Sequence, residues 1–440
     1  MTRTGAPRVL FICAEAVDER PLGVAIRTLE LARAVSEHAE ITVAGIEPSR
    51  QGPGGLPVVS YKRFGSPRRS GIAELIAGAD AIVAQPPWPQ LAHLMARSDA
   101  RLIYDVYDPE PLEVIERLRD GRPSLRRLAG MLTIDRVMQG LADSDHLMCA
   151  TEKQRDLWLG AMIAERLISP AVYDRDQALR ERIDTVPFGL PGEPPRARGT
   201  GARGRFPAIE AEDELILWNG GIWAWLDAPA AIRALALLVQ RRPRAKLVFM
   251  GASTLPAAAR AEEQARELAG SLGLLDRNVF FNDAWVAYEQ RADWLLEADC
   301  VLSTQADHLE TRFAFRTRLL DAIWAGTPIV CTEGDDLAEQ VDREQLGTTV
   351  PPGDPEAIAA ALERVLDLGR GSFAEQLARV APRYAWSAVA KPLVRWVTSE
   401  QPPPRERRPS PRLSQRMRNA GFRAALRGLQ AARIERLPSI

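Results

Sequence analysis

The stretch HLETRFAFRTRLLDAIWAGTP, residues 308–328, decides how the rest of the chain is interpreted. It follows DCVLSTQ (299–305), whose apolar run predicts a buried strand. A helix is expected to begin near Thr317, and its buried side would carry Leu319, Leu320, Ile323 and Trp324. Charge gathers where the strand would pass into this helix, at His308, Glu310, Arg312, Arg316, Arg318 and Asp321. A buried strand followed by a helix is the repeating unit of a parallel α/β sheet.

The same alternation of apolar runs and helical patterns extends over both halves of the chain. In the first half the expected strands are 8–15, 40–46, 81–87, 101–108, 146–152 and 184–189. In the second half they are 215–220, 246–251, 278–283, 299–304, 328–334 and 347–352. Apolar strands separated by helices, such as 26–38, predict parallel sheets covered on both faces. The fold class is therefore α/β, with two doubly wound Rossmann-like domains and an interdomain cleft.

Composition indicates where these domains begin and end. A chain of 440 residues suits two domains, which we expect at 1–190 and 215–382. Residues 191–214 are rich in Pro, Gly and Arg, which is typical of a linker. Residues 383–398 are expected to form a terminal helix that returns toward the N-terminal domain. A basic Pro/Arg-rich tail follows over 399–440.

Charge and cysteine usage exclude several classes of protein. The net charge of -1 predicts no nucleic-acid partner for the protein as a whole. Four Cys sit far apart in apolar runs without metal-ligand spacing, which predicts buried thiols, a reducing cytoplasm and no bound metal. No apolar run reaches the ~18 residues that a membrane-spanning helix needs.

The tail departs from this balance. Residues 401–440 hold ten Arg and two Glu, which gives a local charge of +8. A basic segment with an apolar side can lie on an anionic membrane, here through 405–437 at the inner face. A solvated or partner-packed basic helix is the alternative.

Ligands of doubly wound sheets bind beyond the carboxyl ends of the strands, so residues there are the candidates. Gly23 precedes the first helix and would let backbone N–H groups approach an anion, or it marks a plain turn. Asp105 and Asp108 end the strand at 101–108 and could hold sugar hydroxyls or accept a proton. Asp108 could equally cap the next helix.

The second half offers a glycine pair and the charged loop. Asn219, Gly220 and Gly221 end the strand at 215–220 and permit close approach by a ligand, and Trp223 could stack on a base or pack in the core. Arg316 and Arg318 at a helix start would chelate a diphosphate. The alternative is a local ion pair between Arg318 and Asp321.

DAIWAGTPIV (321–330), with EGDDLAEQV, LGTTVPPGDPEAIAAALERVL, VPFGL (186–190) and RYAWSAVA (383–390), resembles motifs of the retaining GT-B glycosyltransferases of family 4. The resemblance covers most of residues 8 to 398. It implies an N-terminal acceptor domain and a C-terminal donor domain that binds a nucleotide diphosphate sugar. It also places Asp321 where the family has a ribose-binding Glu.

The sequence departs from the family in two places. Phe313 stands eight positions before Asp321, where the family has a Glu that binds the sugar, and the nearest candidate is Glu310. The family's Arg/Lys pair after the first strand of the donor domain is absent from NGGIWAWLD. Arg316 and Arg318 could supply the missing charge.

The resemblance implies transfer of a sugar to a hydroxyl acceptor with retention, without an essential metal. Glu310, Asp108 and Arg318 would be the catalytic residues. The donor would be bound by Gly23, Asn219, Gly220, Gly221, Trp223, His308, Arg316, Arg318 and Asp321. The acceptor, a small molecule or a lipid-linked one, would meet Asp105 and Asp108.

The setting would be surface-polysaccharide, glycolipid or natural-product biosynthesis. A catalytically altered GT-B binding protein and a pseudo-glycosyltransferase or epimerase on the same fold are the alternatives.

Overall fold

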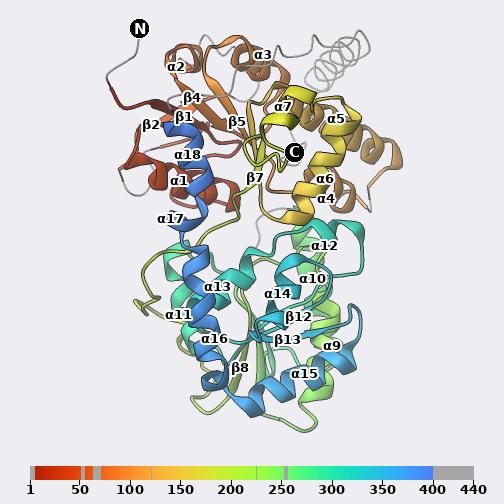
Figure 1. Cartoon of the computed structure of the whole chain (residues 1–440). Coiled ribbons are helices and arrows are strands. Elements are labelled where there is room, and N and C mark those ends of the chain that lie inside the picture. The colour runs from red at the N-terminus through yellow and green to blue at the C-terminus, as the bar shows by residue number, and fades with distance from the viewer. Residues whose placement is uncertain are drawn as a thin grey trace. The chain divides into compact units, whose positions relative to one another are not determined.

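A computed structural model describes residues 5–50, 55–62, 71–119, 121–223, 225–251 and 256–399. The chain divides into two compact units (Figure 1). Unit 1 comprises Met1–Pro187 together with Val389–Ile440, and unit 2 comprises Phe188–Ala388. The basic tail beyond residue 399, including the membrane contact predicted for 405–437, lies outside the described residues.

Unit 1 is built on a seven-stranded parallel sheet in the order β3-β2-β1-β4-β5-β6-β7. Its strands are β1 (Arg8–Ile12), β2 (Glu40–Ile46), β3 (Val58–Tyr61), β4 (Ala81–Ala84), β5 (Arg101–Asp105), β6 (His146–Cys149) and β7 (Ile183–Thr185). The short edge strand β3 was not predicted, because VVSY is only partly buried and does not form a continuous apolar run. Strand order reverses between β1 and β4, which is where doubly wound sheets bind ligands.

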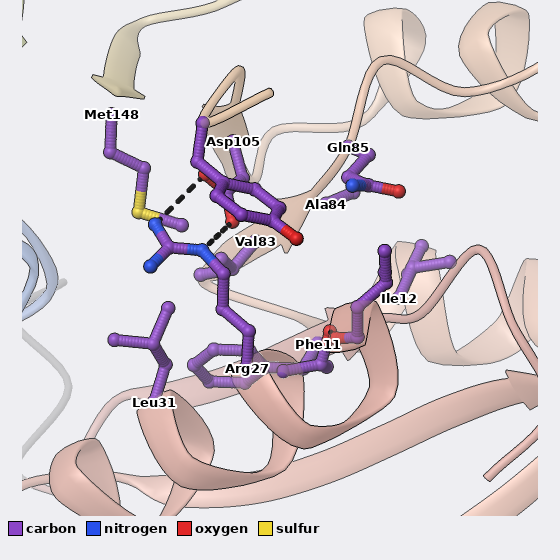
Figure 2. A pocket seen from close by; sticks show the side chains of 12 residues that line it. Phe11, Ile12, Arg27, Leu31, Val83, Ala84, Gln85, Asp105 and Met148 are labelled. Carbon is purple, nitrogen blue, oxygen red and sulfur yellow. Dashed lines mark hydrogen bonds and ion pairs between the residues drawn. The ribbon is translucent and has the colours of Figure 1, made fainter. Parts of the chain in front are cut away.

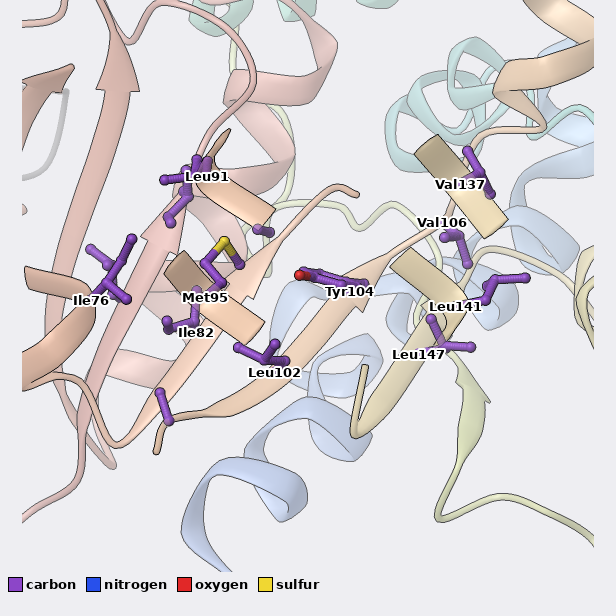
Figure 3. Close-up of a cluster of buried hydrophobic side chains, with 14 of the residues drawn as sticks. Ile76, Ile82, Leu91, Met95, Leu102, Tyr104, Val106, Val137, Leu141 and Leu147 are labelled. Atoms are coloured by element: carbon purple, nitrogen blue, oxygen red, sulfur yellow. The ribbon is translucent and has the colours of Figure 1, made fainter. Parts of the chain in front are cut away.

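Helices cover both faces of this sheet (Figure 1). They are α1 (Gly23–Ser36), α2 (Ile72–Gly78), α3 (Pro89–Arg97), α4 (Glu110–Arg117), α5 (Pro123–Asp143), α6 (Glu152–Ala164), α7 (Pro170–Arg175) and α18 (Lys391–Thr398). One cluster of the core joins β4 and β5 to α3, α5 and β6 through fully buried side chains (Figure 3), among them Ile82, Met95, Leu102, Tyr104 and Leu141.

Unit 2 contains a six-stranded parallel sheet in the order β10-β9-β8-β11-β12-β13. Its strands are β8 (Glu214–Trp218), β9 (Ala245–Phe249), β10 (Val279–Phe281), β11 (Cys300–Ser303), β12 (Ile329–Thr332) and β13 (Gly347–Val350). Its helices are α8 (Ala202–Arg205), α9 (Ala228–Leu238), α10 (Pro256–Ser271), α11 (Arg291–Glu297), α12 (Leu309–Phe313), α13 (Thr317–Ala325), α14 (Asp336–Arg343), α15 (Pro355–Leu368) and α16 (Ala374–Val380). Strand order reverses between β8 and β11.

The segment predicted as a linker, 191–214, is part of unit 2 and packs against it. Its backbone N–H groups at Arg198 and Arg203 donate to the carboxylates of Asp293 and Glu297 on α11, at 2.5 and 2.8 Å. It also contains the short helix α8. The predicted linker therefore packs on unit 2, since side chains distant in sequence satisfy its backbone.

The prediction of a single helix over 383–398 is wrong. The chain there forms a 3-10 turn at Ala381–Tyr384, then α17 (Trp386–Val389), then α18. Ala385 is not helical, because the backbone on either side of it pairs with Leu190 at 2.7 and 3.0 Å. Within unit 1, α18 packs against α1, and Trp396 stacks on His146 with ring centroids 4.9 Å apart.

Candidate functional site

The carboxyl end of β8 in unit 2 is a tightly packed backbone turn. Gly220 has φ +132°, a conformation that side chains disfavour. A Cβ added at Gly251, after β9, would lie 2.6 Å from the carbonyl carbon of Gly220. Gly251 is therefore needed for the turn at Gly220 and Gly221 to pass so closely. The sequence interpretation missed this role, although the predicted strand at 246–251 ends in this glycine.

Arg316 is a buried structural residue. Its guanidinium pairs with Asp335 and donates from Nη2 to the carbonyl oxygen of Thr332 at 2.6 Å. The side chains of Arg316 and Asp335 are 2% and 0% exposed, and Asp335 also caps α14. This pairing uses the charge that was predicted to bind a diphosphate, so the geometry gives Arg316 a role in holding β12 and α14 together.

Arg318, two residues further on, has no carboxylate partner of the kind that holds Arg316, within the described residues. Its Nη2 donates to the carbonyl oxygen of Gly221 at 3.3 Å, and its guanidinium carbon lies 5.4 Å from the centre of the Trp218 ring. Its Nη1 is buried without a hydrogen-bond partner in the part of the chain that the structure describes. Burial, and then the nearby charge of Arg316, lower the pKa of Arg318 to about 10. An uncompensated guanidinium of this kind favours an anionic ligand.

Asn219 positions Arg318 from the end of β8. Its Nδ2 donates to the backbone oxygen of Arg318 at 2.8 Å, which ties the first turn of α13 to β8. The Asn219 side chain is 3% exposed. The N-terminus of α13 is thus held beside Gly220 and Gly221, and the positive end of its dipole adds to the charge of Arg318.

His308 and Glu310 form the other wall of the loop. His308 Nδ1 accepts a hydrogen bond from the backbone N–H of Thr311 at 3.2 Å, so the proton is on Nε2, which lies 3.3 Å from the backbone oxygen of Trp225. Glu310 is 4% exposed, and its Oε2 lies 3.7 Å from His308 Nδ1. The loop therefore holds a carboxylate at the start of α12.

Asp321 does not form an ion pair with Arg318, so the alternative interpretation of a local pair between them is wrong. Its Oδ1 accepts from Arg291 Nε on α11 at 2.9 Å. The Arg291 guanidinium lies between the rings of Tyr288 and Trp324, 3.5 and 4.5 Å from their centres. The sequence interpretation missed Arg291, because nothing in the sequence pattern links α11 to α13.

Trp223 lies next to the glycine turn and is partly exposed. Its ring stacks on that of Trp225, with centroids 5.1 Å apart and planes at 13°. The two rings form one aromatic face beside the loop that contains His308.

In unit 1, Asp105 at the end of β5 is paired with an arginine from the helix that follows β1. Arg27 on α1 donates to both carboxylate oxygens of Asp105, at 2.6 and 3.0 Å (Figure 2). It also donates to the backbone oxygens of Val186 and Pro187. Arg27 and Asp105 line a small pocket together with Ile12, Thr28, Gln85 and Tyr107. The geometry leaves Asp105 with a structural role rather than a free carboxylate for an acceptor.

Asp108 lies beyond this pair. The N-cap of α4 is Pro109, so the interpretation of Asp108 as a helix cap is wrong. Burial, and then the charge of Glu113, raise the pKa of Asp108 well above its usual value, although a hydrogen bond from Tyr107 opposes this. Gly23 is the first residue of α1, and a Cβ there would lie 4.0 Å from the Tyr107 hydroxyl. Unit 1 thus brings Gly23, Tyr107 and Asp108 to one edge of its sheet.

Residues 214–368, from β8 through α15, match the family model described as Glycosyl transferases group 1. The match includes every residue of unit 2 that was predicted for the site. Residues 214–368 are a glycosyl transferases group 1 domain. In this group 1 domain the candidate site comprises the turn after β8 and the loop that leads into α13.

Two curated relatives match part of the chain. An uncharacterised glycosyltransferase of Methanocaldococcus jannaschii is 26% identical over 189 residues, which are 42% of this chain and 45% of that protein. The phosphatidyl-myo-inositol mannosyltransferase of Mycobacterium leprae is 30% identical over 136 residues, 30% of this chain and 34% of that protein. The chain spans less than half the length of these relatives.

Solved structures match over most of both chains. WaaG, a glycosyltransferase involved in lipopolysaccharide biosynthesis, has 18% identity and a TM-score of 0.61, over 89% of this chain and 100% of WaaG. HepE of Anabaena, in complex with UDP and glucose, has 14% identity and a TM-score of 0.65 over the same shares. These likenesses confirm the predicted GT-B fold, in which each unit has a parallel sheet with flanking helices. The cleft predicted between the units stays a prediction.

Three further findings concern metals, thiols and membranes. Within the described ranges, no three His, Cys, Asp or Glu residues gather as they would around a metal ion. All four cysteines are buried, as predicted, and burial raises the pKa of the Cys331 thiol to about 12. None of the described helices has the length and apolar character to cross a bilayer.

Proposed function

We propose that the protein transfers a sugar from a nucleotide diphosphate sugar to a hydroxyl acceptor, with retention of anomeric configuration. The observation that carries this proposal is Arg318, a half-buried arginine at the N-terminus of α13 in the group 1 domain, whose Nη1 is buried without a partner in the described residues. Arginines 27, 291 and 316 are each paired with a carboxylate, whereas Arg318 has no such pair within the described residues and is therefore available to a ligand.

The diphosphate would lie against the glycine turn. A Cβ at Gly220 would lie 3.4 Å from Arg318 Nη2, so the glycine lets the guanidinium lie against the turn. Arg318 Nη1 would donate to the phosphate oxygens, and the dipole of α13 would stabilise their charge. During transfer the bond from the anomeric carbon to the phosphate oxygen breaks and a bond to the acceptor oxygen forms. The acceptor proton passes to the departing phosphate, whose developing charge Arg318 stabilises.

The remaining roles follow from the loop geometry. Glu310, close to His308, would orient the hydroxyls of the donor sugar. Asp321, held by Arg291, would bind the ribose, and Trp223 would face the base. Asp108 would hold the acceptor hydroxyl by a hydrogen bond while the proton passes to the phosphate, since a carboxylate of raised pKa is a stronger hydrogen-bond acceptor. Gly23 would admit a phosphate to the start of α1.

This arrangement supplies its positive charge from Arg318 and a helix dipole, so we propose that turnover requires no metal. The test is donor hydrolysis before and after EDTA treatment. Equal rates are expected, and a loss restored by Mg²⁺ or Mn²⁺ would overturn the proposal.

The proposal as a whole is tested by binding first. UDP, GDP, ADP, dTDP and CDP are compared for their effect on melting temperature, with the wild type and Arg318→Ala. One nucleotide should stabilise the wild type and not the variant, since a ligand at 100 times its Kd adds about 2.7 kcal/mol. No stabilisation by any nucleotide would overturn the donor class.

A non-catalytic GT-B binding protein is the second candidate, because Phe313 replaces the sugar-binding Glu of the family. Hydrolysis of the matching nucleotide sugar, followed by NMR of the released sugar, separates the two. Hydrolysis with retention supports the transferase. Tight binding without hydrolysis or transfer supports the binding protein, and a rearranged or non-glycosidic product supports an epimerase or pseudo-glycosyltransferase.

We propose that the acceptor belongs to a surface polysaccharide, a glycolipid or a natural product, and that the basic segment 405–437 brings the protein to the inner face of a membrane. The charge of +8 in residues 401–440 supports this. Replacing Arg416, Arg418 and Arg423 by Gln should reduce co-sedimentation with anionic vesicles. Unchanged sedimentation would leave the tail as a solvated basic segment.

A further inference from the structure

The outer side of α5 in unit 1 is an exposed apolar surface. Eleven large apolar side chains are exposed among the described residues, and four of them lie on this one helix. They are Leu125, Leu128, Met131 and Ile134, with 37, 37, 51 and 42% of their surface exposed, and we call them the α5 stripe. Their spacing of three residues makes each a neighbour of the next along the helix surface.

The stripe is not needed to hold α5 in place. The opposite side of the helix packs inward through residues spaced mainly four apart, including Ala129, Thr133 and Val137. The helix is therefore apolar on two sides, and helices of that kind are normally buried on both. A contiguous exposed apolar surface marks an interaction site.

The charge around the stripe is positive. The stretch 120–136 contains four Arg and two Asp, a local charge of +2, and Arg122 and Arg127 are exposed. Arg126 is used within the protein, since its Nε donates to the backbone oxygen of Ile115 at 2.9 Å. Nearby carboxylates on α4 have partners of their own: Glu116 lies 2.6 Å from Arg119, and Glu110 pairs with Arg136.

The positive charge favours one of the three partners that could cover this apolar surface. The chain's own tail carries +8, so its approach to Arg122 and Arg127 would be repulsive. A second copy docked through the same face would bring arginines toward arginines across a two-fold axis. An anionic lipid surface accepts both features, because apolar side chains enter the boundary between headgroups and acyl chains while Arg stays among the headgroups.

We propose that the α5 stripe, flanked by Arg122 and Arg127, docks unit 1 on an anionic lipid bilayer. Leu128 and Met131, at the middle of the exposed side, would insert, and the two arginines would lie against lipid phosphates. This contact is independent of the sugar-transfer proposal and of the tail, and it would place the acceptor domain directly at a lipid surface.

The first test places a reporter in the stripe. Because all four native cysteines are buried, Met131→Cys can be labelled selectively with an environment-sensitive fluorophore in the full-length protein. Leu368→Cys, 50% exposed on α15 of unit 2, is the matched control. With vesicles of phosphatidylcholine and phosphatidylglycerol, the label at 131 should brighten and shift to the blue, and the label at 368 should not. No change at 131 would overturn the proposal.

The second test removes the interaction. Leu128→Gln with Met131→Gln should lower vesicle partitioning roughly tenfold or more, since both apolar side chains are lost. Leu272→Gln with Leu368→Gln, which removes similar exposed surface from unit 2, should leave it unchanged. Arg122→Gln and Arg127→Gln should each lower it about fivefold. Melting temperature and donor hydrolysis without vesicles should stay at wild-type values in all four.

Three results would contradict the proposal. Equal partitioning of the stripe variant and the wild type would assign any membrane binding to the tail, which the Arg416, Arg418 and Arg423 substitutions then test. Equal binding to anionic vesicles and to vesicles of pure phosphatidylcholine would show that the arginines do not contribute to binding. A dimer that Leu128→Gln with Met131→Gln converts to a monomer, without vesicle binding, would make the stripe a subunit interface.

Discussion

The carboxyl edges of the two sheets are built alike but differ in charge. Each edge lies where strand order reverses, and each contains an arginine buried against an aspartate, Arg27 with Asp105 in unit 1 and Arg316 with Asp335 in unit 2. Within the described residues, only the second edge has a further arginine, Arg318, with a buried guanidinium nitrogen and no carboxylate partner. A paired arginine stabilises the fold, whereas an uncompensated one costs stability until an anion arrives.

The largest loss of stability is expected from breaking a buried ion pair. Asp335→Ala leaves Arg316 uncompensated and should lower the free energy of unfolding by about 3–5 kcal/mol, measured in urea. Asp105→Ala should do the same in unit 1 through Arg27. Replacing both partners, as in Arg316→Met with Asp335→Leu, should recover much of this loss. If both single variants were as stable as the wild type, the pairs would not be structural.

Replacing Arg318 is expected to weaken ligand binding without lowering the stability of the fold. Arg318→Met should weaken nucleotide diphosphate binding about 10- to 100-fold, since hydrogen bonds to charged groups contribute about 1.5–3 kcal/mol. It should leave the free energy of unfolding unchanged or raised. The lowered pKa means that the folded state holds this proton less tightly than the unfolded state, so the charged form costs stability at neutral pH. The gain should stay constant up to about pH 10 and shrink only as pH rises above the folded-state pKa. A large destabilisation would make Arg318 structural, like Arg316.

A smaller effect is expected from closing the space behind the glycine turn. Gly251→Ala would force the backbone at Gly220 to move, because the added carbon meets backbone and not a flexible side chain. A loss of about 1–3 kcal/mol in unfolding free energy and weaker diphosphate binding should result. Gly270→Ala, where the new carbon meets nothing within 4 Å, is the matched control. Unaltered binding in Gly251→Ala would separate the turn from the ligand site.

The smallest effect concerns pH and Asp108. Its raised pKa means that the folded state binds this proton more tightly than the unfolded state. Its contribution to stability is therefore present below about pH 4 and is lost as pH rises through the folded-state pKa. Asp108→Asn should gain stability relative to the wild type over that rise, measured by urea unfolding between pH 4 and 8. A constant difference would show that Asp108 keeps an ordinary pKa.

The unit 2 site shows how far sequence reasoning reaches. The strand, the loop and the helix at 299–328 could be predicted, because apolar periodicity and glycine positions are local properties of the chain. The different roles of Arg316 and Arg318 could not be predicted. Their roles depend on Asp335, Gly221 and Trp218, which approach them only after β8, β12 and α14 pack together.

The sequence by itself determined the alternation of strands and helices, the α/β class and the resemblance that led to the GT-B fold, because burial periodicity and local motifs need no partner. Only the tertiary structure decided which charges are neutralised, that 191–214 packs on α11, and that the terminal segment breaks at Ala385. Electrostatic compensation and backbone pairing depend on distances between residues far apart in the chain, and folding sets those distances.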